Sequence, residues 1–264
     1  MVYRLENPQV IAKLFEGWEE TMIWSCLQQV MGDIYADDRD HPTAAKAVVG
    51  CFAFLAGRPN PELILHTTGA YTILTPRTEE WALLIEECLG EKAKPAMRYA
   101  ILKEKDVFNP AVLHAYVNAL PKEYELKNMD EALYQRCQKE GWSRDFVSQF
   151  SSYELFETYG QGVLALKEGE MVAGASAYSA YKGGIEVEVD TKPEYRRQGL
   201  ATACSAQLIL NCLEKGLYPS WDAANLWSVA LAEKLGYHRG EPYMIYTLNN
   251  QLNPPDRAVF ECEK

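Results

Sequence analysis

Two arginines and a glycine stand at the start of a predicted helix, in the segment Arg196-Arg-Gln-Gly-Leu-Ala201. The first amides of a helix have no partner inside the helix, and the helix dipole favours an anion near them. Gly199 and the small Ala201 would let the main chain approach a phosphate closely, and Arg196 and Arg197 would supply cations for phosphate oxygens. The segment therefore predicts a phosphate site built on main-chain amides.

The motifs of several other active sites are absent. The chain contains neither GxxxxGK[ST] nor GxGxxG, the loops that hold phosphates in two large groups of nucleotide-binding proteins. Ser176 lies in a segment that lacks the GxSxG spacing of a hydrolase elbow. The histidines are far apart and no CxxC or HExxH occurs, so no metal site is predicted.

The strand predicted just before the phosphate segment has two chemically different faces. Apolar and acidic residues alternate over residues 184–191. A period of two places the apolar side chains on one face of a strand and the polar ones on the other. The acidic face carries Glu186, Glu188 and Asp190. A row of carboxylates is therefore expected beside the predicted phosphate site.

The elements that must position these residues form a regular series. A strand over 124–129, a helix over 130–137 and a helix capped by Ser143 come first. The series continues with these predicted elements: a hairpin of 162–166 and 172–181, the strand 184–191, a helix over 199–215, a strand over 217–221, a helix from an N-cap at Asp222 to Leu235, and two strands at 237–239 and 243–248.

The first 120 residues mix helix and strand signals. Helices are predicted over 10–28 and 79–89, and another from Asn109-Pro110 to the residue before Pro121. Strands are predicted at 29–36, 46–55, 71–74 and 97–102. No phosphate segment of the kind at 196–201 occurs in this region.

Composition favours a globular protein and excludes several partners. A chain of 264 residues, 48% hydrophobic and 24% charged, can bury a core without disulfides or metals. With 26 Lys+Arg against 37 Asp+Glu, the net charge of −11 makes nucleic acid and anionic membranes poor partners. No run is long enough to span a bilayer and the start lacks a signal-peptide layout, so a cytoplasmic protein with free buried thiols is expected.

Two motifs and the element order together resemble the GNAT superfamily of N-acetyltransferases. The pattern R-x-x-G-x-A at 196–201 matches the diphosphate loop of that superfamily, and the run from Asn225 to Tyr237 is similar to its second signature. The longer run 190–202 resembles a bacterial subfamily with an extra N-terminal region. The resemblance implies an α/β (α+β) fold with a mixed, mostly antiparallel central sheet flanked by helices.

The resemblance also implies a cosubstrate and a site for it. Acetyl-CoA would lie between the fourth and fifth strands of the fold, its pantetheine arm on the strand and its diphosphate on the loop. The residues so implied to bind it are Val189, Asp190, Thr191, Arg196, Arg197, Gln198, Gly199, Leu200, Ala201, Thr202 and Asn225.

Catalysis implied by the resemblance needs a base and leaves the acid open. An attacking amine must lose a proton, and Glu188 and Glu186 lie on the strand nearest the thioester; the alternative is that both are solvated polar residues. The superfamily often has a tyrosine acid where this chain has Ala232. Ser228, Tyr237 or solvent could replace it, or no acid is needed.

We therefore expect acetyl transfer to a primary amine of a small molecule, such as an antibiotic or metabolite, without a metal. The alternative is a catalytically degenerate sensor or interaction module that binds acyl-CoA. Residues 121–250 would form the acetyltransferase core and 251–264 a tail. Residues 1–120 would be a degenerate half of the same fold covering the acceptor cleft, or else a packing extension or a homodimer surface.

Overall fold

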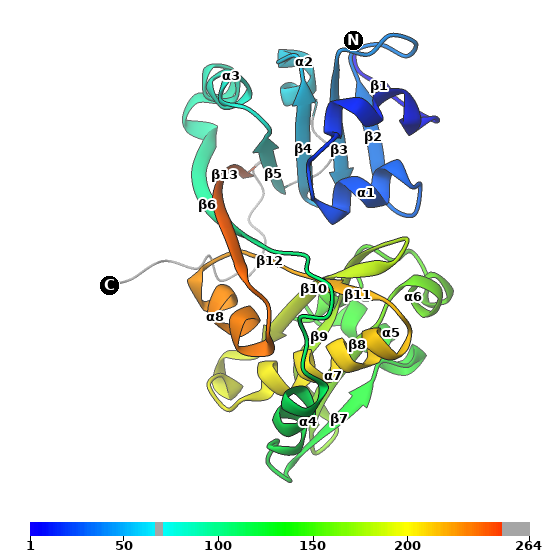
Figure 1. Cartoon of the computed structure of the whole chain (residues 1–264), viewed down its shortest axis with the longest axis vertical. Coiled ribbons are helices and arrows are strands. Elements are labelled where there is room, and N and C mark those ends of the chain that lie inside the picture. Colours follow the sequence, from blue (N-terminus) through cyan, green and yellow to red (C-terminus); the bar gives the residue numbers. More distant parts are fainter. Residues whose placement is uncertain (67–70, 250–264) are drawn as a thin grey trace.

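The strands of the molecule lie in two sheets. The computed structural model describes residues 1–66 and 71–249 (Figure 1). The strands of the larger sheet are, in spatial order, β1 (Tyr3–Arg4), β2 (Asp33–Ala36), β3 (Ala44–Val49), β4 (Phe52–Gly57), β5 (Tyr71–Pro76), β13 (Arg239–Asn249), β6 (Ala93–Ile101) and β12 (Asp222–Ala223). Those of the smaller sheet are β11 (Tyr218–Ser220), β10 (Gly184–Thr191), β9 (Glu170–Tyr181), β8 (Gly162–Lys167) and β7 (Tyr124–Asn128).

Helices connect the strands and cover the sheets, which confirms the expected mixed fold. The α-helices are α1 (Thr21–Leu27), α2 (Pro61–Leu65), α3 (Glu79–Leu89), α4 (Pro110–Asn118), α5 (Glu131–Lys139), α6 (Tyr153–Tyr159), α7 (Leu200–Glu214) and α8 (Leu226–Leu235). The 3-10 helices are η1 (Pro8–Phe15), η2 (Gly90–Lys92), η3 (Arg144–Phe146) and η4 (Pro193–Tyr195). Within the described ranges, no helix combines the length and apolarity that a membrane crossing needs.

The two halves repeat one strand topology. In the first half, β1 to β4 pair as antiparallel neighbours and β4 then pairs in parallel with β5. In the second half, β7 to β10 are antiparallel neighbours and β10 pairs in parallel with β11. The expectation that the first region resembles half of the same fold is therefore confirmed at the level of topology.

The elements around the predicted phosphate segment form as expected. Strand β10 spans 184–191, as its period-two alternation predicts, and its apolar face packs on α7 within one core that includes Ile185, Val187, Leu200 and Leu208. Helix α7 starts right after Gly199 and is buried on most sides, because it lies between the sheet and other elements of this core. The packing fixes the end of β10 close to the start of α7.

The last strand that the structure describes differs from the prediction. Instead of two strands at 237–239 and 243–248, the structure has the single strand β13, which leaves the second half and pairs with β6 on one side and β5 on the other (Figure 1). The residues between the predicted strands form an irregularity between Arg239 and Pro242, which interrupts the register without ending the strand. The strand thereby covers two edges that would otherwise expose unpaired amides and carbonyls.

Three other local predictions are wrong. The strand predicted at 46–55 is two strands, because Gly50 adopts a φ of 57° and forms a turn with Cys51. Ser143 precedes only a 3-10 turn, and its side chain caps no amide. Asp222 lies in strand β12, and the N-cap of α8 is Asn225.

The halves meet over a buried interface between α1 and β9. The Ser25 hydroxyl in α1 donates to the carbonyl of Ala180 in β9 at 2.6 Å. The ring of Tyr178, also in β9, packs in the core of the first half, with its centroid 5.6 Å from that of Phe52. The first half therefore rests directly on the strand that neighbours β10.

Candidate active site

Strand β10 loses one of its partners halfway along its length. Residues 184–186 pair with residues 218–220 of β11, and no pairing with β11 follows. The chain after β11 turns away, and β12 pairs with β6 in the other sheet. Residues 187–191 therefore keep β9 as a neighbour but present their other edge to no strand among the described residues. This opening is where the resemblance places the arm of acetyl-CoA.

The loop that follows β10 presents main-chain amides at the start of α7. Arg197 and Gly199 have left-handed φ angles of 60° and 82°. Gly199 is the N-cap residue of α7, and no side chain caps the helix, so its first amides have no side-chain acceptor. A Cβ built on Gly199 would meet no atom within 4 Å. The site thus fits an anionic group that approaches the main chain from solvent.

The arginines of the loop lie beside the end of β10. The Nε of Arg196 donates to the carbonyl of Thr191 at 3.2 Å, and its guanidinium lies 4.0 Å from the carboxylate of Asp190. Arg196 and Arg197 are both exposed. Burial raises the pKa of Asp190. The structure therefore gathers the strand end and two solvent-facing cations in one place.

The other residues implied to bind the cosubstrate have mixed surroundings. Gln198 is exposed and its Oε1 accepts from the Tyr124 hydroxyl at 2.5 Å, while Leu200 is buried and anchors the first turn of α7. Thr202 is buried and accepts from Lys234 at 3.4 Å. Val189 and Ala201 are half-buried.

Asn225 acts as a cap. Its Oδ1 accepts from the amide of Ser228 at 2.9 Å, so one of its polar atoms is occupied by the start of α8. The hydroxyl of Ser228 in turn accepts from the indole of Trp221 at 2.9 Å. Asn225 and Ser228 of the second signature therefore cap α8 and attach its first turn to Trp221, which lies between β11 and β12.

The two candidate bases differ in burial. Glu186 is 5% exposed, and the Thr21 hydroxyl from α1 donates to its Oε2. Its other oxygen, Oε1, is buried without a hydrogen-bond partner among the residues that the structure describes. Burial raises the pKa of this carboxyl to about 7. Glu188, two residues further along the open strand, is half-buried.

A group of charged residues around Glu186 was not predicted from the sequence. Glu20, the N-cap of α1, is 8% exposed, and its pKa is raised to about 8, first by burial and then by the charge of Glu186. The charges of Lys103 and Arg98 lower the pKa of Glu186, whereas that of Asp222 raises it. These residues come from distant parts of the chain, and no local motif marks them.

Asp222 has its own partners within this group. Its Oδ1 lies 2.5 Å from the Nε of Arg98, and its Oδ2 accepts from the Tyr243 hydroxyl at 2.7 Å. Both side chains of the ion pair are largely buried. The pair links β6 to β12 and so ties the two halves together beside Glu186.

The candidates for a proton donor are few in this structure. Ala232 is fully buried in α8 and has no polar side chain. Tyr237 is buried, donates to the carbonyl of Pro219 at 2.6 Å, and has a pKa well above its usual value because of burial. A phenol so held is a poor acid. Ser228 remains the half-buried hydroxyl among the predicted residues.

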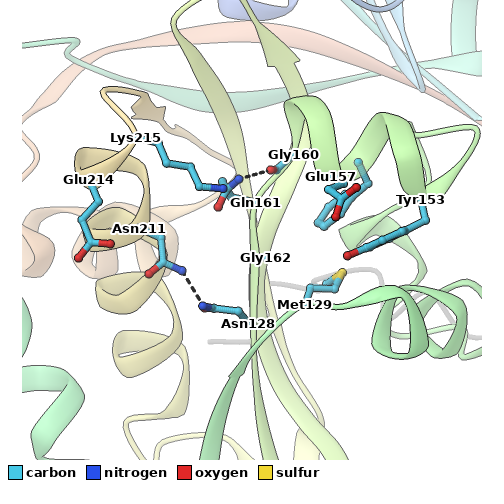
Figure 2. A pocket seen from close by; sticks show the side chains of 11 residues that line it. Asn128, Met129, Tyr153, Glu157, Gly160, Gln161, Gly162, Asn211, Glu214 and Lys215 are labelled. Carbon is cyan, nitrogen blue, oxygen red and sulfur yellow. Dashed lines mark hydrogen bonds between the residues drawn. The ribbon is translucent and has the colours of Figure 1, made fainter.

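Two surface hollows among the described residues are lined by residues other than those of this site, although Glu19, which lines the second, is the neighbour of Glu20. One of about 280 Å³ lies at the far end of α7, where Asn211, Glu214 and Lys215 face Asn128 and Gln161 (Figure 2). Another of about 540 Å³ lies between η1 and α1 and is lined mainly by apolar side chains. Neither contains a residue predicted for catalysis or cosubstrate binding. Within the described ranges, no group of three or more His, Cys, Asp or Glu side chains could hold a metal.

Comparisons with known proteins give a consistent result over nearly the whole chain. A family model described as GNAT acetyltransferase matches residues 12–246. A crystal structure of a GCN5-related N-acetyltransferase-like protein from Streptococcus suis is 45% identical, with a TM-score of 0.87, and the match covers 92% of this chain and 98% of that one.

Two more distant matches agree with these. An uncharacterized N-acetyltransferase of Bacillus subtilis, YdfB, is 25% identical over 240 residues, 86% of this chain and 89% of that protein. A tandem GNAT protein from the clavulanic acid biosynthesis pathway has a TM-score of 0.54 at 14% identity, covering 96% of this chain and 100% of that one. The tandem protein shows a likeness of fold alone.

Proposed function

The chain belongs to the GNAT acetyltransferase family, and from that premise we propose that it transfers an acetyl group from acetyl-CoA to a primary amine of a small molecule. One observation carries the proposal: the edge of β10 opens after Glu186, and that open edge leads into the uncapped start of α7. A ligand with an extended amide-containing arm and a diphosphate suits such a pair of features.

In this proposal the main chain holds most of the cosubstrate. The open strand edge of residues 189–191 faces the arm, and the amides of residues 197–202 receive the diphosphate. At Thr191 the amide donates to Asp190 and the carbonyl accepts from Arg196, so the arm would replace or share these contacts. Arg196 and Arg197 add charge at the solvent side of the loop. Asn225 contributes through its position at the start of α8, since its Oδ1 already caps that helix.

Glu186 is the base in this proposal. When bound, acetyl-CoA supplies an activated acyl group, and the amine must be neutral to attack it. A base works best when its pKa lies near the operating pH, and burial raises the pKa of Glu186 to about 7. The Thr21 hydroxyl holds one oxygen of this carboxylate and leaves the other to meet the acceptor. Glu188 is the second candidate and is expected to matter less.

The departing thiolate needs little help. Ala232 offers no proton and Tyr237 is committed to the carbonyl of Pro219. Ser228, whose hydroxyl is oriented by Trp221, is the donor within the chain that the proposal retains, with solvent as its alternative. Replacing Ser228 by alanine distinguishes the two, since only the first would lose turnover.

Two measurements on the purified protein test the proposal. Calorimetric titration with acetyl-CoA measures binding, and release of coenzyme A thiol in the presence of tyramine, putrescine, spermidine, glucosamine and lysine measures transfer. Binding together with amine-dependent thiol release would support acetyl transfer. Binding without release from any amine would favour the acyl-CoA sensor instead. No binding at millimolar acetyl-CoA would reject both.

A further inference from the structure

Two buried carboxylates approach the open edge of β10 from different halves of the molecule. Glu186 is the last residue of β10 that pairs with β11, so it stands where the two strands part. Glu20 precedes Thr21, whose hydroxyl donates to Glu186. The two carboxylates are close enough that the charge of Glu186 raises the pKa of Glu20. Glu20 is held by the amide of Met22, which donates to its Oε1 at 3.2 Å.

The charges around this pair do not balance. The neighbouring Asp222 is neutralised by Arg98 and also accepts from Tyr243. The cation left for Glu20 and Glu186 is Lys103, whose ammonium group also donates to the carbonyl of Glu19 at 2.8 Å. Fully ionised, the five charged side chains carry one negative charge in excess. A buried site of this kind is stabilised by one further proton or by one further cation.

A polar atom in the pair also lacks a partner. The Oε1 of Glu186 is buried and accepts no hydrogen bond from any described residue. A buried carboxylate oxygen without a donor is costly, and a catalytic role or a bound water or ion explains such an atom in a native site. An ammonium group would supply the positive charge that balances the pair and an N–H donor for the Oε1 of Glu186.

We propose that Glu20 and Glu186 act as a pair that binds the acceptor's ammonium group, so that the first half of the chain supplies part of the active site. This inference rests on the proposed acetyl transfer and deepens it, since it assigns the acceptor a protonated amine on arrival. Glu20 then binds and positions the amine, and Glu186 removes the proton.

The proton balance of the reaction follows from this arrangement. An N–H bond of the ammonium breaks and its proton passes to the carboxylate pair, which leaves a lone pair on nitrogen. Nitrogen then bonds to the acetyl carbon as the C–S bond breaks, with its electrons leaving on sulfur. The thiolate takes a proton from Ser228 or from solvent, the second proton lost from nitrogen restores that donor, and the pair returns its proton to solvent.

Several other groups act on the pair and set the direction of its titration. The groups around Glu186 are Thr21 and Glu20 of α1, Arg98 of β6, Lys103 after it, Asp222 of β12, Tyr181 of β9, Tyr218 of β11 and Tyr237 after α8. Each carboxylate of a close pair raises the pKa of the other. In this pair the charge of Glu186 is among the causes that raise the pKa of Glu20.

Kinetics with the best amine of the panel tests the pair at its function. Glu20→Gln is expected to raise the KM for the amine by roughly tenfold or more, because a charge-assisted hydrogen bond is lost. The KM for acetyl-CoA should stay unchanged, and kcat should fall less than the amine KM rises. Glu19→Gln, an exposed neighbour, should match the wild type. An unchanged amine KM in Glu20→Gln would reject the pair while leaving acetyl transfer intact.

A second measurement needs no turnover and tests the pair in the wild-type protein, so it still decides if Glu20→Gln folds poorly. Infrared titration of the whole protein from about pH 5 to about pH 9 follows the signal of protonated carboxyl groups. Most of this pH range lies above the ordinary pKa of glutamate, so the signal reports carboxyls whose pKa is raised. Methylammonium should shift its loss to lower pH in the wild type, whereas tetramethylammonium, which has no N–H, should shift it less. A methylammonium shift that is absent, or that persists undiminished in Glu20→Gln, would overturn the inference.

Discussion

The parallel strand pair is closed in the first half of the molecule and open in the second. Strands β4 and β5 pair through residues 52–55 and 73–76, and β5 is then covered by β13. Strand β10 pairs with β11 only through residues 184–186, and β11 is the last strand of its sheet. The crossover helix is also longer in the second half, 15 residues in α7 against five in α2.

The difference shows what turns a shared topology into a site. An opening requires a partner strand that ends early, and an anion site at its mouth requires a helix start with free amides beside the strand end. The first half meets neither condition. It contributes in another way, because Thr21 and Glu20 reach from α1 to the strand of the second half that opens.

The largest effect is expected from removing the carboxylate where the edge of β10 opens. Glu186→Gln is expected to lower kcat by roughly 100-fold to 1,000-fold, because general base catalysis contributes about that much. The KM for acetyl-CoA should stay constant, since the loop before α7 is untouched. Steady-state thiol release measures both, with Glu125→Gln on the exposed face of β7 as the control. A Glu188→Gln variant that is slower than Glu186→Gln would transfer the role to Glu188.

The ion pair of Arg98 and Asp222 tests how far the stability of the molecule depends on the contact between its halves. Arg98→Met leaves Asp222 buried without its cation and is expected to lower the free energy of unfolding by about 3 kcal/mol. Denaturant unfolding followed by tryptophan fluorescence measures it, and the exposed Arg239→Met is the control. A loss no larger than that of the control would show that the pair does not hold the halves together.

The anion site of the second half is tested at Gly199. Gly199→Asp places a negative side chain beside the free amides, and an aspartate tolerates a φ of 82° only with strain. The dissociation constant for acetyl-CoA should rise about tenfold, roughly 1.4 kcal/mol. Gly169 has the same φ and equally open surroundings in the turn between β8 and β9, so Gly169→Asp is a matched control. Equal affinities in the two variants would contradict a diphosphate at α7.

The smallest effect is expected from Thr21 of α1, which changes the pKa of Glu186. The Thr21 hydroxyl stabilises ionised Glu186 and so lowers the pKa of this carboxyl. Thr21→Val should therefore raise that pKa and move the acid limb of kcat/KM to higher pH, by roughly one pH unit for one hydrogen bond. Thr158→Val, which removes a hydroxyl on the exposed α6, should leave the profile unchanged. A shift to lower pH would reverse the assigned role.

Local patterns in the sequence predict the strand and the helix start of the site, but not the residues that reach it from distant parts of the chain. The alternation in 184–191 and the glycine at 199 mark β10 and the start of α7, because each reflects a rule that acts within a few residues. The meeting of Glu20 with Glu186 depends on how two halves pack, which no short pattern encodes. The same holds for Asp222, whose sequence context suits a helix cap although its carboxylate pairs with Arg98. The proposed tail, 251–264, lies outside the described residues.

The placement of β13 has a consequence for how the protein is made. A ribosome releases residues 71–101 long before residues 239–249, yet the sheet of the first half needs that late strand between β5 and β6. Until it arrives, the nascent chain holds two strand edges that can pair with other chains. The early half thus cannot complete its sheet by itself, because β13, the last strand that the structure describes, takes the place between β5 and β6.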